Sequence, residues 1–198
     1  MNYVSCHDNH TLFDRIALTA PKASRADRIR MNDLAAAFSI LSQGIPFMQA
    51  GEEMLRTKPT EDGGFDDNSY RAPDAVNAIK WGDLSKDEYQ KNVDYYRGLI
   101  AFRKAHSGLR LTKREQVLAA VTPLAVDDAL AAAYQVREAD CEIILLFNAS
   151  AKTVSLPLPE GAWEVNIQDG KAGTATLSYA EGSASAAPIS ATVLTRKV

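Results

Sequence analysis

The chain has 198 residues, a formal net charge of −3 at pH 7, and 46% hydrophobic against 24% charged residues. This is the composition of a globular protein, and it excludes a disordered or membrane-embedded chain. The sequence contains no basic stripe, so nucleic acid is not an expected partner. No apolar run is long enough to cross a membrane, so a membrane is not an expected partner either.

The first predicted element is a short buried strand over residues 2–6, which leads directly into His7-Asp8-Asn9. A (β/α) barrel presents its catalytic groups in this way, because they lie at the C-terminal ends of its strands. A barrel strand needs a neighbour on each side, and no strand precedes this one. We therefore interpret the chain as the C-terminal part of a larger enzyme that carries part of an active site.

Two helices are expected next. Residues 11–19 predict a short helix that ends before Pro21, and residues 24–43 predict a longer one. Ser24 is a natural N-cap for the second helix, and Gly44 is expected to stop it. An apolar stripe on this helix would pack against a sheet, and it consists of Leu34, Phe38 and Leu41.

Residues 45–51 predict a second short buried strand, with Pro46 at its first position. The order strand, helix, strand is that of a βαβ unit, which implies parallel pairing of the two strands. A long polar loop over residues 51–84 follows, and loops of this length are usually functional or disordered. Residues 85–106 then predict a helix that ends at Gly108, with a stripe made of Tyr89, Val93, Tyr96, Leu99, Ile100 and Phe102.

From about residue 109 the pattern becomes one of short apolar or alternating runs separated by turn signals. This pattern is typical of an antiparallel β-sandwich. The expected strands are 116–122, 130–137, 142–148, 152–158, 162–168, 174–179 and 189–197. The small-residue stretch 183–187 is expected to be a loop, and Trp163 is expected in the core of the sandwich.

The two cysteines, Cys6 and Cys141, are expected to be buried free thiols rather than a disulfide or a metal pair. No cofactor or metal is expected. His106 is expected to act as a favourable cation at a helix C-terminus. The first residues contain neither a basic nor an apolar segment of a signal peptide, so the compartment, cytoplasmic or secreted, stays open.

Three blocks of the sequence resemble the α-amylase superfamily of glycoside hydrolases, and most closely its type I pullulanase branch. Residues 3–9, Tyr-Val-Ser-Cys-His-Asp-Asn, resemble the superfamily segment at the end of barrel strand seven. Residues 44–53, Gly-Ile-Pro-Phe-Met-Gln-Ala-Gly-Glu-Glu, resemble the segment around strand eight. Residues 68–81, from Asn-Ser-Tyr-Arg to Ile-Lys-Trp, are similar to the loop that follows strand eight in pullulanases.

The resemblance implies a fold and a set of roles. Residues 1–108 would be the last two strand–helix units of a (β/α)8 TIM barrel, and residues 109–198 a C-terminal antiparallel β-sandwich. Asp8 would be the catalytic transition-state stabiliser, and His7, Asn68 and Tyr70 would bind substrate, with Tyr70 also ordering its loop.

The same resemblance implies an α-glucan as partner: pullulan, limit dextrin or a glycogen-like glucan. The parent enzyme would be a starch-debranching hydrolase that cleaves α-1,6 linkages with retention. In this superfamily the nucleophile and the acid/base come from strands four and five, and the chain contains neither. The fragment alone is therefore expected to be inactive, and its uncovered apolar surface is expected to cause self-association.

Other readings stay open at this point. Glu52 and Glu53 could be acid/base groups, although a supporting carboxylate and a loop charge fit better. Asp66 and Asp67 could bind calcium, but they lack the alternation of a calcium loop, which favours a solvated or sugar-facing loop. Two functional alternatives also remain: a non-catalytic carbohydrate-binding module, and a subunit that completes a barrel supplied by a second chain.

Overall fold

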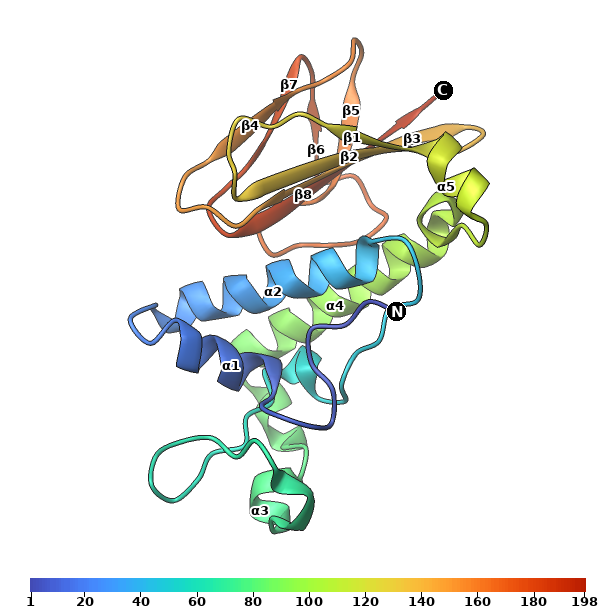
Figure 1. The fold of residues 1–198 in the computed structure, drawn as a ribbon. Coiled ribbons are helices and arrows are strands. Elements are labelled where there is room, and N and C mark those ends of the chain that lie inside the picture. Colours follow the sequence, from blue (N-terminus) through green and yellow to red (C-terminus); the bar gives the residue numbers. More distant parts are fainter.

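The computed structural model describes all residues from 1 to 198 and arranges them in three layers (Figure 1). A helical layer covers one face of a six-stranded antiparallel sheet, and a two-stranded sheet covers the other face. The α-helices are α1 (Leu12–Thr19), α2 (Arg25–Leu41), α3 (Asp74–Asn77), α4 (Asp87–Ala105) and α5 (Arg114–Ala120). The 3₁₀ turns are η1 (Glu52–Met54), η2 (Ser69–Arg71), η3 (Trp81–Ser85) and η4 (Ser107–Arg110). The strands are β1 (Val121–Leu124), β2 (Ala131–Arg137), β3 (Cys141–Asn148), β4 (Val154–Pro157), β5 (Trp163–Ile167), β6 (Ser178–Ala180), β7 (Ser183–Ala186) and β8 (Ser190–Lys197).

The helices begin where their capping residues predict. Ser24 caps α2, and its hydroxyl accepts a hydrogen bond from the backbone N–H of Asp27 at 3.0 Å. Thr11 caps α1 in the same way through the backbone N–H of Asp14. None of the helices is long and apolar enough to span a lipid bilayer.

The two expected strands before residue 52 are reduced to one parallel bridge between Asn2 and Pro46. Two backbone hydrogen bonds of 2.8 Å make it, from Asn2 N to the Ile45 carbonyl and from Phe47 N to the Asn2 carbonyl. The direction of pairing is the expected parallel one, but the predicted lengths, 2–6 and 45–51, are wrong. A barrel strand is stabilised by hydrogen bonds to a neighbouring strand on each side. Within residues 1–198 each of these two segments pairs only with the other, so neither extends into a full strand.

The six-stranded sheet has the strand order β1-β2-β3-β8-β5-β6, and β4 pairs with β7 in the small sheet. Strand β3 is central and is buried on both faces. Its Ile143, Leu145 and Phe147 lie in the cluster shared with the helices, whereas Ile144 and Leu146 lie in the cluster shared with the small sheet. Because both faces of β3 are buried in this way, the sequence of the strand is continuously apolar from Ile143 to Phe147.

Several sequence expectations for the second half are wrong in their details. Residues 114–120 form α5 instead of a strand, since the segment Arg-Glu-Gln-Val-Leu-Ala-Ala consists mostly of strong helix formers. Residues 183–186 form β7 instead of a loop, because alternate alanines there are buried against the large sheet. The strand expected at 174–179 is confined to Ser178–Ala180. Trp163 is completely buried, as expected.

The helix faces are also rotated from the expected stripes. Helix α2 buries Ala36, Ala37, Ile40 and Leu41 against the sheet, because small alanines let the backbones approach closely. Phe38 is instead 45% exposed and meets the Phe147 ring at the edge of the contact. On α4, Ile100 is exposed, while the core receives Tyr95, Tyr96, Leu99 and Phe102.

The main hydrophobic cluster contains residues on both sides of position 108. It joins α2 and α4 to the inner face of the large sheet, and Figure 1 shows α2 running along the sheet with α4 crossing behind α2. Packing therefore links the two predicted domains through one core, and the boundary between residues 108 and 109 stays a prediction.

Candidate functional site

The segment that carries His7 and Asp8 is anchored to the protein interior by a network of buried side-chain hydrogen bonds. Ser5 Oγ donates to Glu52 Oε2 at 2.5 Å, and Tyr96 Oη donates to Glu52 Oε1 at 3.2 Å. Asn32 Nδ2 donates in turn to Tyr96 Oη at 3.0 Å. Burial raises the pKa of the Glu52 carboxyl, and its two hydrogen bonds oppose that shift. Glu52 is thus a supporting carboxylate, while Glu53 accepts from the backbone of Gly51.

Beyond this anchor the chain turns outward and presents two polar side chains. His7 Nε2 lies 3.5 Å from Asp8 Oδ2, and the two side chains are 86% and 75% exposed. Asn9 follows at φ 66°, a left-handed conformation that asparagine tolerates. Thr11 then starts α1, so the exposed stretch is short and anchored at both ends.

A second anchor fixes the loop that faces this stretch. Asp14 is fully buried on α1, and its carboxylate accepts hydrogen bonds from the Thr57 hydroxyl and from the backbone N–H of Lys58 at 2.8 Å. His10 Nε2 lies 3.3 Å from the Phe65 carbonyl. These contacts attach the loop after η1 to the N-terminal segment, although more than 40 positions separate the partners.

The part of that loop around Asn68 is shaped by neighbouring side chains. Asp66 Oδ1 accepts from the backbone N–H of Asn68 at 2.8 Å. Asn77 Nδ2 donates to the carbonyls of Ser69 at 2.6 Å and Ala72 at 3.1 Å. Tyr70 is 73% exposed and its ring lies against the Arg71 guanidinium. Asp66 and Asn77 therefore hold the loop, and the Tyr70 ring extends from it.

His7, Asp8, Asn68 and Tyr70 line one cavity of about 300 Å³. The fold thus brings together residues that lie 60 positions apart in the sequence. Six further residues line the cavity: Gln49, Arg56, Lys58, Asp67, Ser69 and Asn77. Asp67 belongs to the acidic pair for which the sequence favours a solvated or sugar-facing loop, and the sequence predicts no site role for the other five. The sequence distinguishes Arg56 and Lys58 only as two basic residues near the start of a loop that is rich in acidic residues.

The cavity is polar and has charges of both signs. Lys58 is almost fully buried, and burial, with the neighbouring Arg56, lowers the pKa of its ammonium group. The carboxylates of Asp66, Asp14 and Asp8 act in the opposite direction. Gly51, at φ +89°, lets the Arg56 side chain pass, since a Cβ at this glycine would lie 2.8 Å from Arg56 Cδ. A polar, hydroxyl-bearing ligand suits such walls better than an apolar one.

Three other aromatic residues lie outside this cavity. Tyr96 belongs to the core, as expected from its helical spacing, and Tyr89 is half-buried beside Arg25. Trp81 is 64% exposed but does not line the cavity. Cys6 and Cys141 are both free, as expected, but only half-buried.

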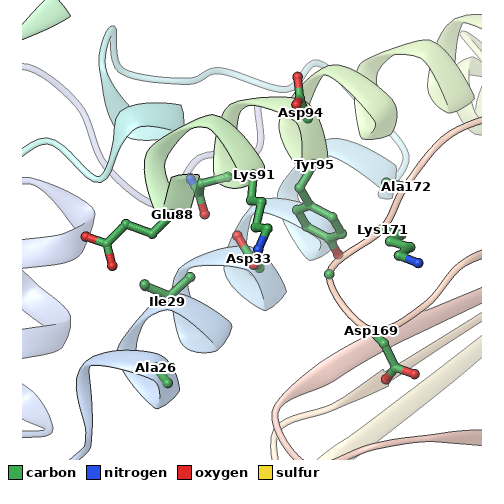
Figure 2. A pocket seen from close by; sticks show the side chains of 12 residues that line it. Ala26, Ile29, Asp33, Glu88, Lys91, Asp94, Tyr95, Asp169, Lys171 and Ala172 are labelled. Carbon is green, nitrogen blue, oxygen red and sulfur yellow. The ribbon is translucent and has the colours of Figure 1, made fainter. Parts of the chain in front are cut away.

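A larger cavity of about 630 Å³ lies between α2, α4 and the loop after β5 (Figure 2). Asp33 lines it, and burial raises the pKa of this carboxyl to about 7. Its Oδ1 atom is buried and has no hydrogen-bond partner. None of the four predicted site residues lies on this cavity.

The fold and the sequence match one class of protein. No protein-family model matches the chain. The solved structure of the pullulanase from Bacillus acidopullulyticus superposes with a TM-score of 0.90 at 34% identity, over 98% of this chain and 24% of that one. The Paenibacillus barengoltzii pullulanase, solved with maltohexaose and α-cyclodextrin, gives a TM-score of 0.84 at 36% identity, over 99% of this chain and 29% of that one.

Among curated proteins, the pullulanase of Bacillus subtilis strain 168 is 33% identical over 163 residues, which cover 80% of this chain and 22% of the relative. In sequence and in fold the chain is pullulanase-like and corresponds to the C-terminal region of those proteins. It spans less than a third of the length of each relative named above.

Proposed function

We propose that the chain is the C-terminal portion of a starch-debranching glycoside hydrolase that cleaves α-1,6-glucosidic linkages with retention. Residues 1–108 are the last two strand–helix units of its (β/α)8 barrel, and residues 109–198 are a β-sandwich that follows the barrel. The parallel bridge between Asn2 and Pro46, with α1 and α2 between them, supports the first assignment. The two facing antiparallel sheets support the second.

One observation carries the functional assignment: His7, Asp8, Asn68 and Tyr70 line one polar cavity in a pullulanase-like chain. Glycoside hydrolysis passes through an oxocarbenium-like state in which positive charge develops near the anomeric carbon. The Asp8 carboxylate stabilises that charge more strongly than it stabilises the neutral ground state, which lowers the barrier. His7, Asn68 and Tyr70 contact the sugar hydroxyls and position the ring.

The exposure of Asp8 explains why the isolated chain is expected to be inactive. A carboxylate that is 75% exposed acts through water, which weakens its field on a developing cation. Full stabilisation requires walls that exclude solvent, and a barrel of about 250 residues supplies them. The nucleophile and the acid/base also belong to the preceding strands in this proposal.

A chimera tests the proposal. Residues 1–198 would replace the corresponding C-terminal region of the Bacillus subtilis pullulanase, which would supply the upstream strands. We expect the chimera to release reducing ends from pullulan and to leave amylose, which lacks α-1,6 linkages, uncut. The 198-residue chain alone should leave both uncut. A folded chimera that is inactive on pullulan, while the unmodified enzyme is active, would contradict the proposal.

A further inference from the structure

Three donor atoms of different chemistry meet where α4 ends against the β2–β3 hairpin. His106, Glu138 and Cys141 each offer one potential metal ligand, and these atoms all lie within 4.8 Å of one another. All three residues are partly buried. The cluster lies outside the cavity of Asp8, and its chemistry does not depend on the proposed glucan activity.

The hairpin backbone sets two of the donors side by side. Glu138 follows β2 and Cys141 begins β3, and the Glu138 N–H donates to the Cys141 carbonyl at 2.7 Å. This bond closes a two-residue turn, so the two side chains are cross-strand neighbours. Their proximity is therefore fixed by the register of β2 and β3.

The third donor comes from the helical layer and is already oriented. The His106 ring lies against Phe102 with centroids 4.3 Å apart and a tilt of 39° between the planes, and its Nδ1 lies 2.9 Å from Glu138 Oε2. The other carboxylate oxygen, Oε1, accepts from the backbone N–H of Gly108 and from Ser107 Oγ. The backbone thus holds one oxygen of Glu138 in place, while the other faces the imidazole.

The local charge favours a cation. The thiol of Cys141 lies in the field of three carboxylates, those of Glu138, Asp140 and Glu142. Glu142 is compensated by Arg137 and Arg196. Glu138 pairs with the His106 imidazole, and Asp140 has no partner among the ion pairs of the structure, so the carboxylate of Asp140 leaves negative charge near the sulfur.

We propose that His106, Glu138 and Cys141 form a binding site for a divalent zinc-type metal ion. One nitrogen, one oxygen and one sulfur donor make a ligand set that zinc accepts in tetrahedral geometry, with water in the fourth position. On binding, the thiol gives up its proton to solvent and a metal–sulfur bond forms; no oxidant or reductant is needed. The ion would join the end of α4 to the sheet.

The required movement is small. Zinc bonds of about 2.0 to 2.3 Å place tetrahedral ligand atoms roughly 3.3 to 3.8 Å apart. The His106 Nδ1 and Glu138 Oε2 atoms lie 2.9 Å apart and would separate by about 0.4 Å or more, and the 4.8 Å limit for the set leaves about 1 Å to close. Rotation of the short Cys141 side chain covers such a distance.

Cobalt(II) is the probe, because a thiolate ligand gives it a near-ultraviolet charge-transfer band and tetrahedral coordination gives it intense visible bands. The 198-residue chain would be stripped with a chelator, reduced and titrated with cobalt, then with zinc as competitor. We expect one equivalent to bind with both signals and zinc to displace it. Cys141→Ser should lose the thiolate band. Glu138→Gln removes a charged ligand and should weaken binding by at least about tenfold, since even partners outside the first coordination shell contribute that much.

Cys6→Ser is the matched control, since it removes the other cysteine and leaves the three donors intact. It should bind cobalt like the parent chain. Zinc should raise the thermal midpoint of the parent and of Cys6→Ser but not of Cys141→Ser, with circular dichroism confirming that each variant is folded. The proposal is overturned if no thiolate band forms, or if the band disappears in Cys6→Ser and persists in Cys141→Ser.

Discussion

A single carboxyl, Asp33, shows how burial without a partner affects stability. Its Oδ1 atom has no hydrogen-bond partner, and burial raises the pKa of the group to about 7. In the unfolded chain the same group ionises near its usual pKa of about 3.9. Between these two values the unfolded state loses its proton first, so ionisation favours unfolding as the pH rises.

We predict that the free energy of unfolding falls between about pH 4 and pH 7 through Asp33 and levels off above that range. Asp33→Asn removes this ionisation. At pH 8 the variant should be more stable than the parent by about 1 to 3 kcal/mol, and at pH 4 the two should be nearly equal. Urea denaturation across the pH range measures the difference.

Asp94→Asn is the control for that experiment. Asp94 lines the same cavity, but its side chain is 55% exposed. Its substitution should leave the parent pH profile almost unchanged, because exposed ion pairs contribute little. Parallel profiles for the parent and Asp33→Asn would show that Asp33 is not the buried acid.

At the scale of elements, the approach between α4 and the loop after β5 depends on Gly98. A Cβ at this position would lie 2.0 Å from the Ala172 carbonyl oxygen, which is a backbone atom that cannot move alone. The helix and the loop therefore touch through their main chains. This contact attaches the sheet to the helical layer beside the cavity of Asp33.

We predict that Gly98→Ala destabilises the chain by about 1 to 3 kcal/mol, although alanine is the better helix former. Gly82→Ala is the matched control, since a Cβ there meets nothing within 4 Å, and its effect should stay within about 0.5 kcal/mol. Chemical denaturation of the two variants measures both values. If Gly98→Ala and Gly82→Ala had the same free energy of unfolding, the close contact between Gly98 and Ala172 would be contradicted.

Sequence patterns located most elements but not their faces or their lengths. Caps such as Ser24 are local signals, so α2 begins where the sequence predicts. The buried side of that helix depends on how closely the sheet approaches, and no pattern within the helix specifies that distance. The sequence does not predict strand β7 for a related reason: its alanines are small and become a buried face only because the large sheet covers them.

The sequence predicts four residues of the candidate site, whose roles stay a prediction, but not most of the other residues that line its cavity. His7, Asp8, Asn68 and Tyr70 came from motif resemblance, and the structure places all four on one cavity. Arg56 and Lys58 share that cavity in a loop that Asp14 attaches to α1. A contact between positions more than 40 apart leaves no periodic signal in the sequence, so these residues could not be identified.

For the whole molecule, the relevant feature is an open apolar hollow of about 540 Å³ beside α2. Val4, Phe38, Leu130 and Phe147 are among its lining residues, and Phe38 and Leu130 are 45% and 62% exposed. Contiguous apolar surface of this kind is rarely left open to water. In the proposed parent enzyme the preceding barrel units would lie near it.

We predict that the isolated chain self-associates through this hollow. Light scattering after size-exclusion chromatography should give a mass above the 21.5 kDa of the monomer. Phe38→Ser should shift the population toward monomer, whereas Leu177→Ser, a change at another exposed leucine, should not. A monomeric parent chain at high concentration would contradict the prediction.

The central claim is that Asp8 stabilises the charge that develops on the sugar, and turnover of the pullulanase chimera tests it most directly. Asp8→Asn should lower kcat by a factor on the order of 1,000 while KM changes only a few-fold, because the interaction strengthens in the transition state. Asp74→Asn, an exposed acid outside the cavity, should leave both constants unchanged. Near-normal kcat in Asp8→Asn would contradict the claim.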